Sequence, residues 1–296
     1  MTETARSTAD LYAELRPRLF GIAYRMLGGV AEAEDVVQEA FLRLHRAQEE
    51  GTAVDNPGAF LTTVTTRLAI DQLRSARARR EQYVGPWLPE PLLADERDVG
   101  EHAELAESLS MAFLVVLERL SPVERAVFLL HDVFGYGYEE VAPIVGTSEV
   151  NCRQLAARAR RHVADGRPRF DAPPARREEL AARFLAACEK GDLEGLLGLL
   201  AEDAAAYFDA GGKAPAPPRP IFGRERVARV VLGIAVKVAR LGHRTVPARV
   251  NGQPGAVFLD QAGAVVGVVD IDVADGAVKA IRSVTNPDKL AHVRLT

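Results

Sequence analysis

The stretch GYGYEEVAPIVGTSEVNCRQLAARARRHV, residues 135–163, decides the fold of the middle of the chain. Its second half carries four arginines within nine residues, although the whole chain has a formal net charge of −4. At 100° per residue, a helix over residues 149–163 collects small and apolar side chains on one narrow face and the arginines on the other. The packing face would consist of Cys152, Leu155, Ala156, Ala159 and Val163. The pattern predicts a helix that packs on one side and is free on the other.

The residues before this helix complete a helix-turn-helix pattern. YEEVAPIV, residues 138–145, predicts a short first helix, which Pro143 would kink or shorten. Gly146 and Thr147 form the turn, and Ser148 is a suitable N-cap for the second helix. The second helix of such a motif reads DNA, with its first residues nearest the bases and its basic residues near phosphate. The predicted DNA contacts are Ser148, Glu149, Asn151, Arg153, Gln154, Arg158 and Arg161. The alternative is a solvated basic face on an all-helical domain.

Composition places the chain among soluble globular proteins of several domains. It has 296 residues, of which 48% are hydrophobic and 26% are charged. The two cysteines, Cys152 and Cys188, lie far apart without a CxxC spacing, so we expect no disulfide framework, no metal site and no cofactor. The N-terminus lacks the apolar core of a signal peptide, and no apolar run is long enough to span a membrane. We therefore expect a cytoplasmic protein.

Periodicity and breaks divide the chain into four segments. Apolar spacings of three and four predict an all-α domain over residues 8–82, with Asn56 and Pro57 at the start of its third helix. Residues 83–104 contain several prolines and the single tryptophan, which indicates a linker with a docking motif. Residues 105–166 return to a helical pattern. Residues 177–296 form a separate C-terminal segment.

The C-terminal segment changes class along its length. Three helical stretches are expected over residues 177–192, 193–203 and 223–242, with a Gly/Pro-rich segment before the third. The end of the chain alternates apolar and polar residues and contains Asn251-Gly252 and Asp275-Gly276, which are typical hairpin turns. The segment is predicted to be an α+β domain with an antiparallel sheet.

A ridge of hydrogen-bond acceptors lies on the second predicted helix. Val36, Val37, Ala40, Phe41 and Leu44 form its buried stripe, and Asp35, Gln38 and Glu39 lie together on the exposed side. The ridge indicates a protein-binding surface, and the alternative is an ordinary solvated acidic face. No nearby histidine completes a set of metal ligands.

The third predicted helix carries a second basic patch. Arg67, Asp71 and Arg74 lie on successive turns, and Arg77 follows them. Melted or single-stranded DNA would suit this surface, because arginine follows the phosphate backbone and a pocket can hold an unstacked base. A salt-bridged helix end explains the same residues.

In this order, the stretches resemble the RNA polymerase sigma factors of the extracytoplasmic-function group. EDVVQEAFLRL is similar to the segment with which the family grips the clamp helices of the largest subunit of core RNA polymerase, which implies that role for Asp35, Gln38 and Glu39. FLTTVTTRLAIDQLRS is similar to the family's promoter-melting helix at the −10 element. Arg67 departs from the family there, which often has Asn. The resemblance implies sigma domain 2 over residues 8–82, and sigma domain 4 with −35 recognition over residues 105–166.

Three short motifs resemble the subgroup that carries a fused SnoaL-like C-terminal domain. They are WLPEPL at 87–92, DAGGK at 209–213 and NPDKL at 286–290, with Ala210 where the subgroup usually has Gly. The resemblance implies a cone of helices and a curved antiparallel sheet over residues 177–296 that regulates the sigma domains. The expected interdomain residues are Trp87, Pro89, Glu90, Asp209, Gly211, Gly212, Lys213, Asn286, Pro287 and Asp288. We further expect the DAGGK loop and the terminal motif to receive the linker, with Trp87 as its anchor.

Two readings of the C-terminal domain compete. In the first, the domain regulates a transcription initiation factor that is not an enzyme, either as an interdomain lock or through a small-molecule ligand. In the second, it is a cyclase- or isomerase-type enzyme, and His243, Asp270 and Asp272 are the candidates for proton transfer. The two aspartates share one face of a strand, which is equally compatible with exposure to water.

Overall fold

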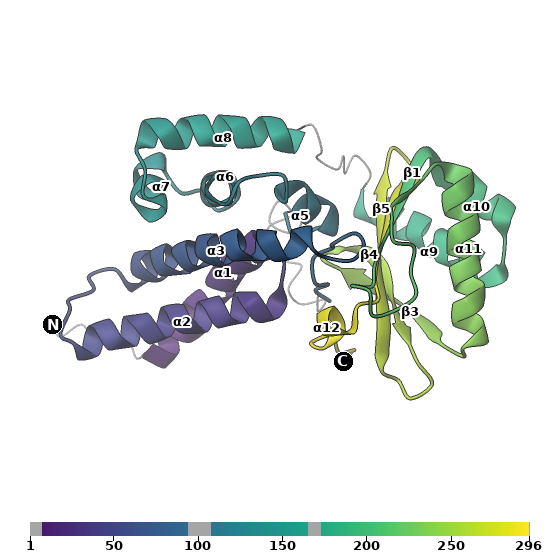
Figure 1. The fold of residues 1–296 in the computed structure, drawn as a ribbon, viewed down its shortest axis with the longest axis horizontal. Helices are drawn as coiled ribbons and strands as arrows, with labels where there is room; N and C mark the ends of the chain where they lie inside the picture. Colours follow the sequence, from purple (N-terminus) through teal and green to yellow (C-terminus); the bar gives the residue numbers. More distant parts are fainter. Residues whose placement is uncertain (1–7, 94–107, 165–172, 296) are drawn as a thin grey trace. The chain divides into compact units, whose positions relative to one another are not determined.

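The computed structural model describes residues 8–93, 108–164 and 173–295, apart from the side chains of residues 8–10, 77–79 and 81. These residues form two compact units (Figure 1). The helical unit comprises residues 8–81 and 116–164, and the sheet unit comprises residues 82–93, 108–115 and 173–295. The described part of the predicted linker therefore belongs to the sheet unit. The rest of that linker, residues 94–104, lies outside the described residues.

The helical unit is built from helices joined by short turns. Its elements are α1 (Thr8–Leu27), α2 (Val30–Glu49), α3 (Pro57–Glu81), α6 (Pro122–Phe128), the π-helical turn η2 (Leu129–Val133), α7 (Tyr138–Val145) and α8 (Glu149–Ala164). Helix α5 (Met111–Leu117) begins in the sheet unit and ends in the helical unit. The predicted start of α3 is confirmed, because Asn56 Oδ1 accepts a hydrogen bond from Ala59 N at 3.0 Å.

The predicted apolar stripes form the core of the helical unit. Helix α2 buries Ala33, Val36, Val37, Ala40, Phe41 and Leu44, which confirms the stripe expected from the sequence. Leu19, Ile22 and Met26 of α1 and Leu61 and Leu73 of α3 are buried as well. The three helices pack through faces whose apolar residues recur at helical spacing.

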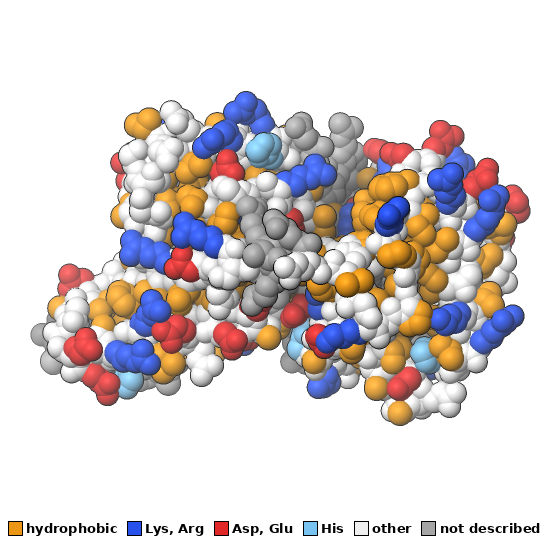
Figure 2. All heavy atoms as spheres, in the orientation of Figure 1, with side chains coloured by type: hydrophobic (Ala, Val, Ile, Leu, Met, Phe, Trp, Pro, Cys, Tyr) orange, Lys and Arg blue, Asp and Glu red, His pale blue; other side chains and the backbone are white. Residues whose placement is uncertain are grey.

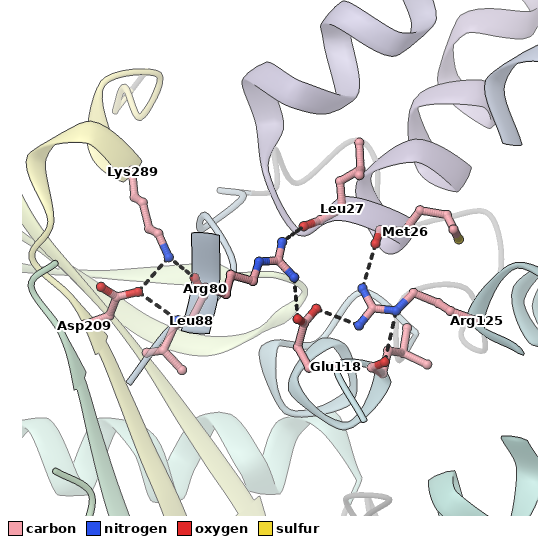
Figure 3. Close-up of polar contacts among 9 residues, drawn as sticks. Met26, Leu27, Arg80, Leu88, Glu118, Arg125, Asp209 and Lys289 are labelled. Carbon is pink, nitrogen blue, oxygen red and sulfur yellow. Dashed lines mark hydrogen bonds and ion pairs between the residues drawn. The ribbon is translucent and has the colours of Figure 1, made fainter. Parts of the chain in front are cut away.

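A buried arginine joins α6 to the end of α1. Arg125 is 1% exposed and donates to Met26 O at 2.6 Å, to Leu117 O at 3.0 Å and to Glu118 at 2.6 Å. Arg80 donates to the same Glu118 and to Leu27 O (Figure 3). Because α1 ends at Leu27, its last carbonyls have no partner within the helix, and the two arginines satisfy them. Burial raises the pKa of Glu118, but Arg125 and Arg80 outweigh it and hold that pKa below its usual value.

The sheet unit combines a six-stranded sheet with helices. Its elements are α9 (Pro174–Lys190), α10 (Leu193–Leu199), β1 (Leu200–Asp209), β2 (Ile221–Phe222), α11 (Arg224–Arg240), β3 (Arg244–Val250), β4 (Gln253–Leu259), β5 (Val265–Ala274), β6 (Ala277–Val284) and α12 (Pro287–Leu290). The strand order is β2-β1-β6-β5-β4-β3, and every neighbouring pair is antiparallel except β1 and β6, which are parallel. Two all-α regions followed by an α+β domain agree with the predicted class.

Strand β1 corrects one expectation. The sequence predicts a helix over residues 193–203, but the helix ends at Leu199 and residues 200–209 form a strand. Leu200, Ala201 and Glu202 favour a helix by their intrinsic propensities. Here the strand lies between β2 and β6 in the sheet, with Ala204, Ala206 and Phe208 in the core. Tertiary packing therefore overrides the local preference.

The two predicted hairpins are confirmed, and the sheet has a core on each face. Asn251 and Asp275 adopt φ of 51°, and the glycine after each also has positive φ, as tight hairpin turns require. Val269, Ile271 and Ile281 pack against the helices, in one apolar cluster with α9, α10 and α11. Val268 and Val284 point to the other face of the sheet, where they belong to a second apolar cluster that includes Leu88 and Met111. The linker segment therefore supplies part of the second core.

Candidate functional site

The helix-turn-helix forms as the sequence predicts. Helix α7 ends at Gly146, which adopts φ of 73°, and α8 begins after Ser148. The Ser148 hydroxyl accepts a hydrogen bond from Asn151 N at 3.2 Å, which confirms the cap. The buried residues of α8 are Cys152, Leu155, Ala156, Ala159 and Val163, the predicted packing face.

The free face of α8 presents most of the predicted DNA contacts to solvent. Figure 2 shows basic side chains gathered along this helix. Arg153 forms an exposed ion pair with Glu149 at 2.9 Å, and Arg158 lies 3.5 Å from Glu124. Gln154 and Arg161 are exposed as well. Exposed pairs of this kind contribute little to stability, so these arginines can exchange their partners for phosphate at small cost.

Two features of α8 differ from the sequence interpretation. Asn151 donates its side-chain amide to Thr147 Oγ1 at 2.8 Å, so it strengthens the turn. Val150 is 63% exposed at the first turn of α8, although it is apolar. The sequence analysis omitted Val150 because it considered only polar residues. An apolar side chain at this position can contact a thymine methyl group.

The basic patch on α3 is divided between two roles. Arg67 donates to Pro143 O at 2.8 Å and to Ile144 O at 3.0 Å, at the C-terminal end of α7. Cations are favourable there because the last helical carbonyls lack partners. Asp71 and Arg74 form an exposed ion pair at 3.0 Å. The side chain of Arg77 lies outside the described residues.

The acceptor ridge on α2 is accessible. Asp35 and Gln38 are exposed, and Glu39 is half-buried beside Arg43 at 2.8 Å. The hydrogen bond from Arg43 lowers the pKa of Glu39 below its ordinary value. Leu42 lies one turn beyond Gln38 and is 42% exposed, so the ridge includes an apolar residue that the sequence analysis did not select.

The linker segment is held by the carboxylate of Asp209, which is fully buried at the end of β1. Its Oδ2 accepts from Leu88 N at 2.8 Å, and its Oδ1 accepts from the Tyr83 hydroxyl at 2.5 Å. Burial, together with this hydrogen bond, raises the pKa of Tyr83, so its hydroxyl remains a donor at neutral pH. Asn286 donates to the same hydroxyl oxygen at 2.8 Å. The linker, DAGGK and NPDKL motifs therefore meet at one site.

Lys289 completes this site, which we call the Asp209 clasp: Tyr83, Leu88, Asp209, Asn286 and Lys289. The buried ammonium lies 2.7 Å from Asp209 Oδ2 and also donates to Leu88 O (Figure 3). It lies 4.3 Å from the centroid of the Trp87 ring. The half-buried Trp87 covers the lysine, whereas the apolar anchor is Leu88, which is 1% exposed. Trp87 therefore contacts the terminal motif, and its neighbour Leu88 is the linker side chain that is fully buried.

The glycine loop approaches the linker closely. Gly211 has φ of 56°, and a Cβ atom there would lie 2.4 Å from Asn286 Nδ2. Gly212 has φ of 73° and packs beside Val84. Lys213 forms an exposed ion pair with Asp288. Larger residues at the two glycines would therefore collide with the linker or distort the loop.

Further contacts extend along the linker to residue 93. Pro89 is buried, and Glu90 lies 3.9 Å from His292 Nδ1, while Pro287 begins helix α12. Asn251 binds both main-chain groups of Leu92: its N–H donates to Leu92 O at 2.7 Å, and its Oδ1 accepts from Leu92 N at 2.9 Å. Leu93 forms a single antiparallel bridge with Val250. The linker is thus bound mainly through its main chain.

The candidate proton-transfer residues are separated by the sheet. Asp270 and Asp272 lie on one face of β5, as expected, but they are buried and pair with Arg282 at 3.0 and 3.2 Å. Burial is the main reason that the pKa of Asp270 is raised to about 7, with Arg282 opposing and Asp272 reinforcing the shift. His243 lines a cavity on the opposite face, together with Val269. The structure therefore does not bring His243 and the two aspartates together at one site.

Within residues 8–93, 108–164 and 173–295, no group of three or more His, Cys, Asp and Glu side chains is placed to hold a metal ion. In the same part of the chain, no helix is long and apolar enough to cross a membrane.

Known proteins share both halves of this architecture. Sigma-70 region 2 matches residues 11–79, and Sigma-70, region 4 matches residues 110–163. The chain is 41% identical over 293 residues to the ECF RNA polymerase sigma factor SigJ of Mycobacterium tuberculosis, covering 94% of this chain and 91% of that protein. The chain belongs to the extracytoplasmic-function (ECF) sigma factors. It is also 34% identical to a probable ECF sigma factor, SigI, of the same organism, covering 94% and 93% of the two chains.

The match extends to structure. The crystal structure of M. tuberculosis SigJ aligns with a TM-score of 0.78 and 37% identity, covering 97% of this chain and all of that chain (100%). As an ECF sigma factor, the protein initiates transcription at specific promoters and binds core RNA polymerase and promoter DNA. The resemblance inferred from the six motifs is confirmed over nearly the whole chain, including the C-terminal domain.

The structure adds residues to the linker site of this ECF sigma factor that the sequence analysis missed. They are Tyr83, Leu88, Lys289 and Asn251, each hydrogen-bonded to another segment of the sheet unit. Lys289 lies inside the NPDKL motif, and its position beside Asp288 was the available signal. Nothing in the sequence distinguishes Asn251 from an ordinary turn residue.

Proposed function

We propose that the sheet unit regulates this ECF sigma factor by holding the linker segment in the Asp209 clasp. The observation that carries the proposal is the buried carboxylate of Asp209, which binds the linker main chain at Leu88 and the Lys289 ammonium together. A promoter with two elements requires a defined spacing between the domains that read them. Holding residues 83–93 restricts the connection between those domains, and releasing them would give that connection more freedom.

The sigma domains have separate roles in this proposal. We assign sigma domain 2 to residues 8–82, the linker to 83–104, sigma domain 4 to 105–166 and the regulatory domain to 177–296. Helix α8 would read the −35 element through Glu149, Arg153 and Gln154, with Arg158 and Arg161 at phosphates. This assignment is supported by the exposure of these side chains on a capped, well-packed helix.

Helix α3 would contact the −10 element, and the α2 ridge would bind the polymerase clamp helices. Asp71 and Arg74 are exposed and form an ion pair with each other, so DNA can replace that pairing. Arg67 must first leave the carbonyls of Pro143 and Ile144. Asp35, Gln38 and Glu39 provide acceptors around the exposed Leu42, a mixture of charge and apolar surface suited to a protein partner.

A small molecule is a second candidate input to the sheet unit. Phe184, Val231 and Phe258 line a cavity of about 740 Å³, within the range of ligand sites. Asp270 and Asp272 do not line it, so the geometry favours binding over proton-transfer chemistry. We therefore propose a transcription factor without turnover.

Transcription with reconstituted core polymerase tests these assignments, using a promoter mapped with the wild-type protein. The double variant Asp35→Arg/Glu39→Arg should abolish polymerase binding and transcript, while Glu49→Arg on the same helix should retain both. Asp209→Asn should change transcript yield and expose residues 83–93 to protease. Asp203→Asn is the matched control, because Asp203 lies on the same strand but is exposed.

Two results would contradict the proposal. Unchanged yield for Asp209→Asn, with its linker demonstrably released, would show that holding the linker does not control initiation. Undiminished polymerase binding by the double variant would remove the α2 ridge from the interface. Folding of each variant should be checked by circular dichroism before either conclusion.

A further inference from the structure

The cavity in the sheet unit has an apolar interior. It lies between α9, α11 and the helix-facing side of the sheet, and its volume is about 740 Å³. The interior side chains are Phe184, Phe208, Val231, Ile234, Phe258 and Ile281. Burial raises the pKa of Cys188, which also lines the cavity, to about 12. That thiol is therefore neutral at physiological pH and adds to the weakly polar wall.

The rim of the cavity is cationic. Lys190, Arg240 and Arg244 line it, against one carboxylate, Glu189. All three cations are exposed, and none forms an ion pair or side-chain hydrogen bond with any residue in the described parts of the chain. Most other described arginines do form such contacts, for example Arg229 with Glu225. The rim therefore concentrates positive charge that the protein itself does not neutralise.

Helix ends explain only part of this pattern. Lys190 and Arg240 lie in the last turns of α9 and α11, where a cation is favourable even without a ligand. Arg244 begins strand β3 and has no such explanation. Arg244 nevertheless lines the same cavity, next to His243 and Thr245. A ligand with one anionic group would satisfy all three cations together.

We propose that this cavity binds a long-chain alkyl carboxylate, with the alkyl chain among the aromatic and aliphatic side chains and the carboxylate at Lys190, Arg240 and Arg244. The inference extends the small-molecule input proposed above and does not depend on the Asp209 clasp. The apolar interior excludes a strongly polar ligand, because its hydrogen-bonding groups would lose water without gaining partners. The cationic rim distinguishes a carboxylate from a neutral lipid.

Displacement of dansyl-undecanoic acid from the full-length protein tests the inference. Octanoate, dodecanoate and hexadecanoate should displace the probe with increasing affinity, by up to about fourfold for each methylene group that enters the cavity. Hexadecanol should bind about tenfold more weakly than hexadecanoate, because it lacks the charge. Each competitor is used below its micelle concentration.

Variants separate the two parts of the site. Arg240→Gln/Arg244→Gln should weaken hexadecanoate about tenfold and leave hexadecanol unchanged, whereas Lys237→Gln, on the same helix outside the rim, should change neither. Val231→Phe should fill the interior and weaken both ligands. Binding that is absent for every chain length, or equal for acid and alcohol, would overturn the inference. Because the readout is binding alone, failure here leaves the transcription test of the clasp unaffected.

Discussion

The two units each contain a buried cluster of carboxylate and cation, but the clusters hold different things. In the helical unit, Arg80 and Arg125 share Glu118, and their remaining N–H groups bind carbonyls at helix ends. In the sheet unit, Asp209 and Lys289 form a single pair, and their remaining capacity goes to the linker. The first cluster connects helices, and the second binds a segment with almost no secondary structure of its own.

This difference determines what each cluster controls. The helices around Arg125 satisfy most of their main-chain groups themselves, so the cluster fixes only how they pack. The main-chain N–H and C=O of Leu88 have no helix or sheet partner and depend on the clasp. Loss of the first cluster should therefore destabilise a whole unit. Loss of the second should release a segment and leave the unit folded.

The largest expected effect follows removal of Arg125. Arg125→Met keeps most of the side-chain volume but leaves Glu118 with one cation and removes the arginine N–H groups that bind the carbonyls of Met26 and Leu117, of which Leu117 O keeps its main-chain donor, Leu120 N. Breaking a buried pair in this way costs about 3–5 kcal/mol of unfolding free energy. Native-state hydrogen exchange of amides in α1 and α6 measures the loss.

Arg153→Met is the control, because its pair with Glu149 is exposed and worth about 0.5 kcal/mol at most. A loss below about 1 kcal/mol for Arg125→Met would show that apolar packing, and not the ionic cluster, holds the helices together.

A smaller effect should follow truncation of the linker anchor. Leu88→Ala removes a fully buried side chain and should lower the free energy of releasing residues 83–93 by about 3 kcal/mol. Trp87→Ala should lower it by about 1 kcal/mol, since the ring is half-buried and lies over the Lys289 ammonium. Protease cleavage within the linker, measured as a rate, compares the two variants. Faster cleavage in Trp87→Ala than in Leu88→Ala would show that Trp87, and not Leu88, anchors the linker.

This pair of residues shows where sequence reasoning stops. Periodicity and caps predicted α2, α3 and the helix-turn-helix, because each depends on residues within one or two turns, such as Ser148 and Asn151. The choice between Trp87 and Leu88 depends on which side chain enters a core formed by Val250, Val257 and Leu290. Those residues are more than 150 positions away, so no local sequence pattern predicts whether Trp87 or Leu88 is the more deeply buried.

Long-range contacts also decide which lysine pairs with Asp209 and whether residues 200–209 form a helix or a strand. Pairing Asp209 with Lys289, rather than with the nearer Lys213, requires α12 to be placed beside the end of β1. The start of β1, LAED at residues 200–203, continues the helical pattern of the preceding leucines, and only the pairing of β1 with β6 identifies it as a strand. The alternation of residues along β5 correctly predicts that Asp270 and Asp272 share one face of the strand. It cannot predict that this face is buried beside Arg282, because the residues that cover it come from distant parts of the chain.

The buried carboxylate of Asp270 predicts that the stability of the sheet unit depends on pH between about 4 and 7. Burial raises the pKa of Asp270 from 3.8 to about 7, so the folded state holds a proton that the unfolded state releases near pH 4. Stability from this group is therefore greatest below pH 4, falls as pH rises toward 7 and is constant above that. Between pH 5.5 and pH 7 the unfolding free energy should fall by about 2 kcal/mol.

The variant Asp270→Asn should remove this dependence. Native-state hydrogen exchange of amides in β5 and β6, the inner strands of the sheet, corrected for the pH dependence of intrinsic exchange, reports unfolding of that unit. Subtracting the variant's pH profile from that of the wild type cancels the contribution of histidines common to both. Equal slopes would mean that Arg282 keeps Asp270 ionised in the folded protein, despite its burial.

The smallest effect should come from Lys213, which provides the sharpest comparison with Lys289. Both lysines pair with an aspartate, and the pairs link DAGGK to NPDKL, but the side chains of Lys213 and Asp288 are 50% and 64% exposed. Lys213→Met should lower the free energy of linker release by less than about 1 kcal/mol, and 0.5 M salt should abolish the difference from wild type. Lys289→Met leaves Asp209 buried without its cation, so it should release the linker at any salt concentration. Cleavage rates within residues 83–93 at low and high salt measure both variants. If the two substitutions release the linker equally, burial is not what gives the Asp209 clasp its strength, and the exposed pair carries as much of the regulation as the buried one.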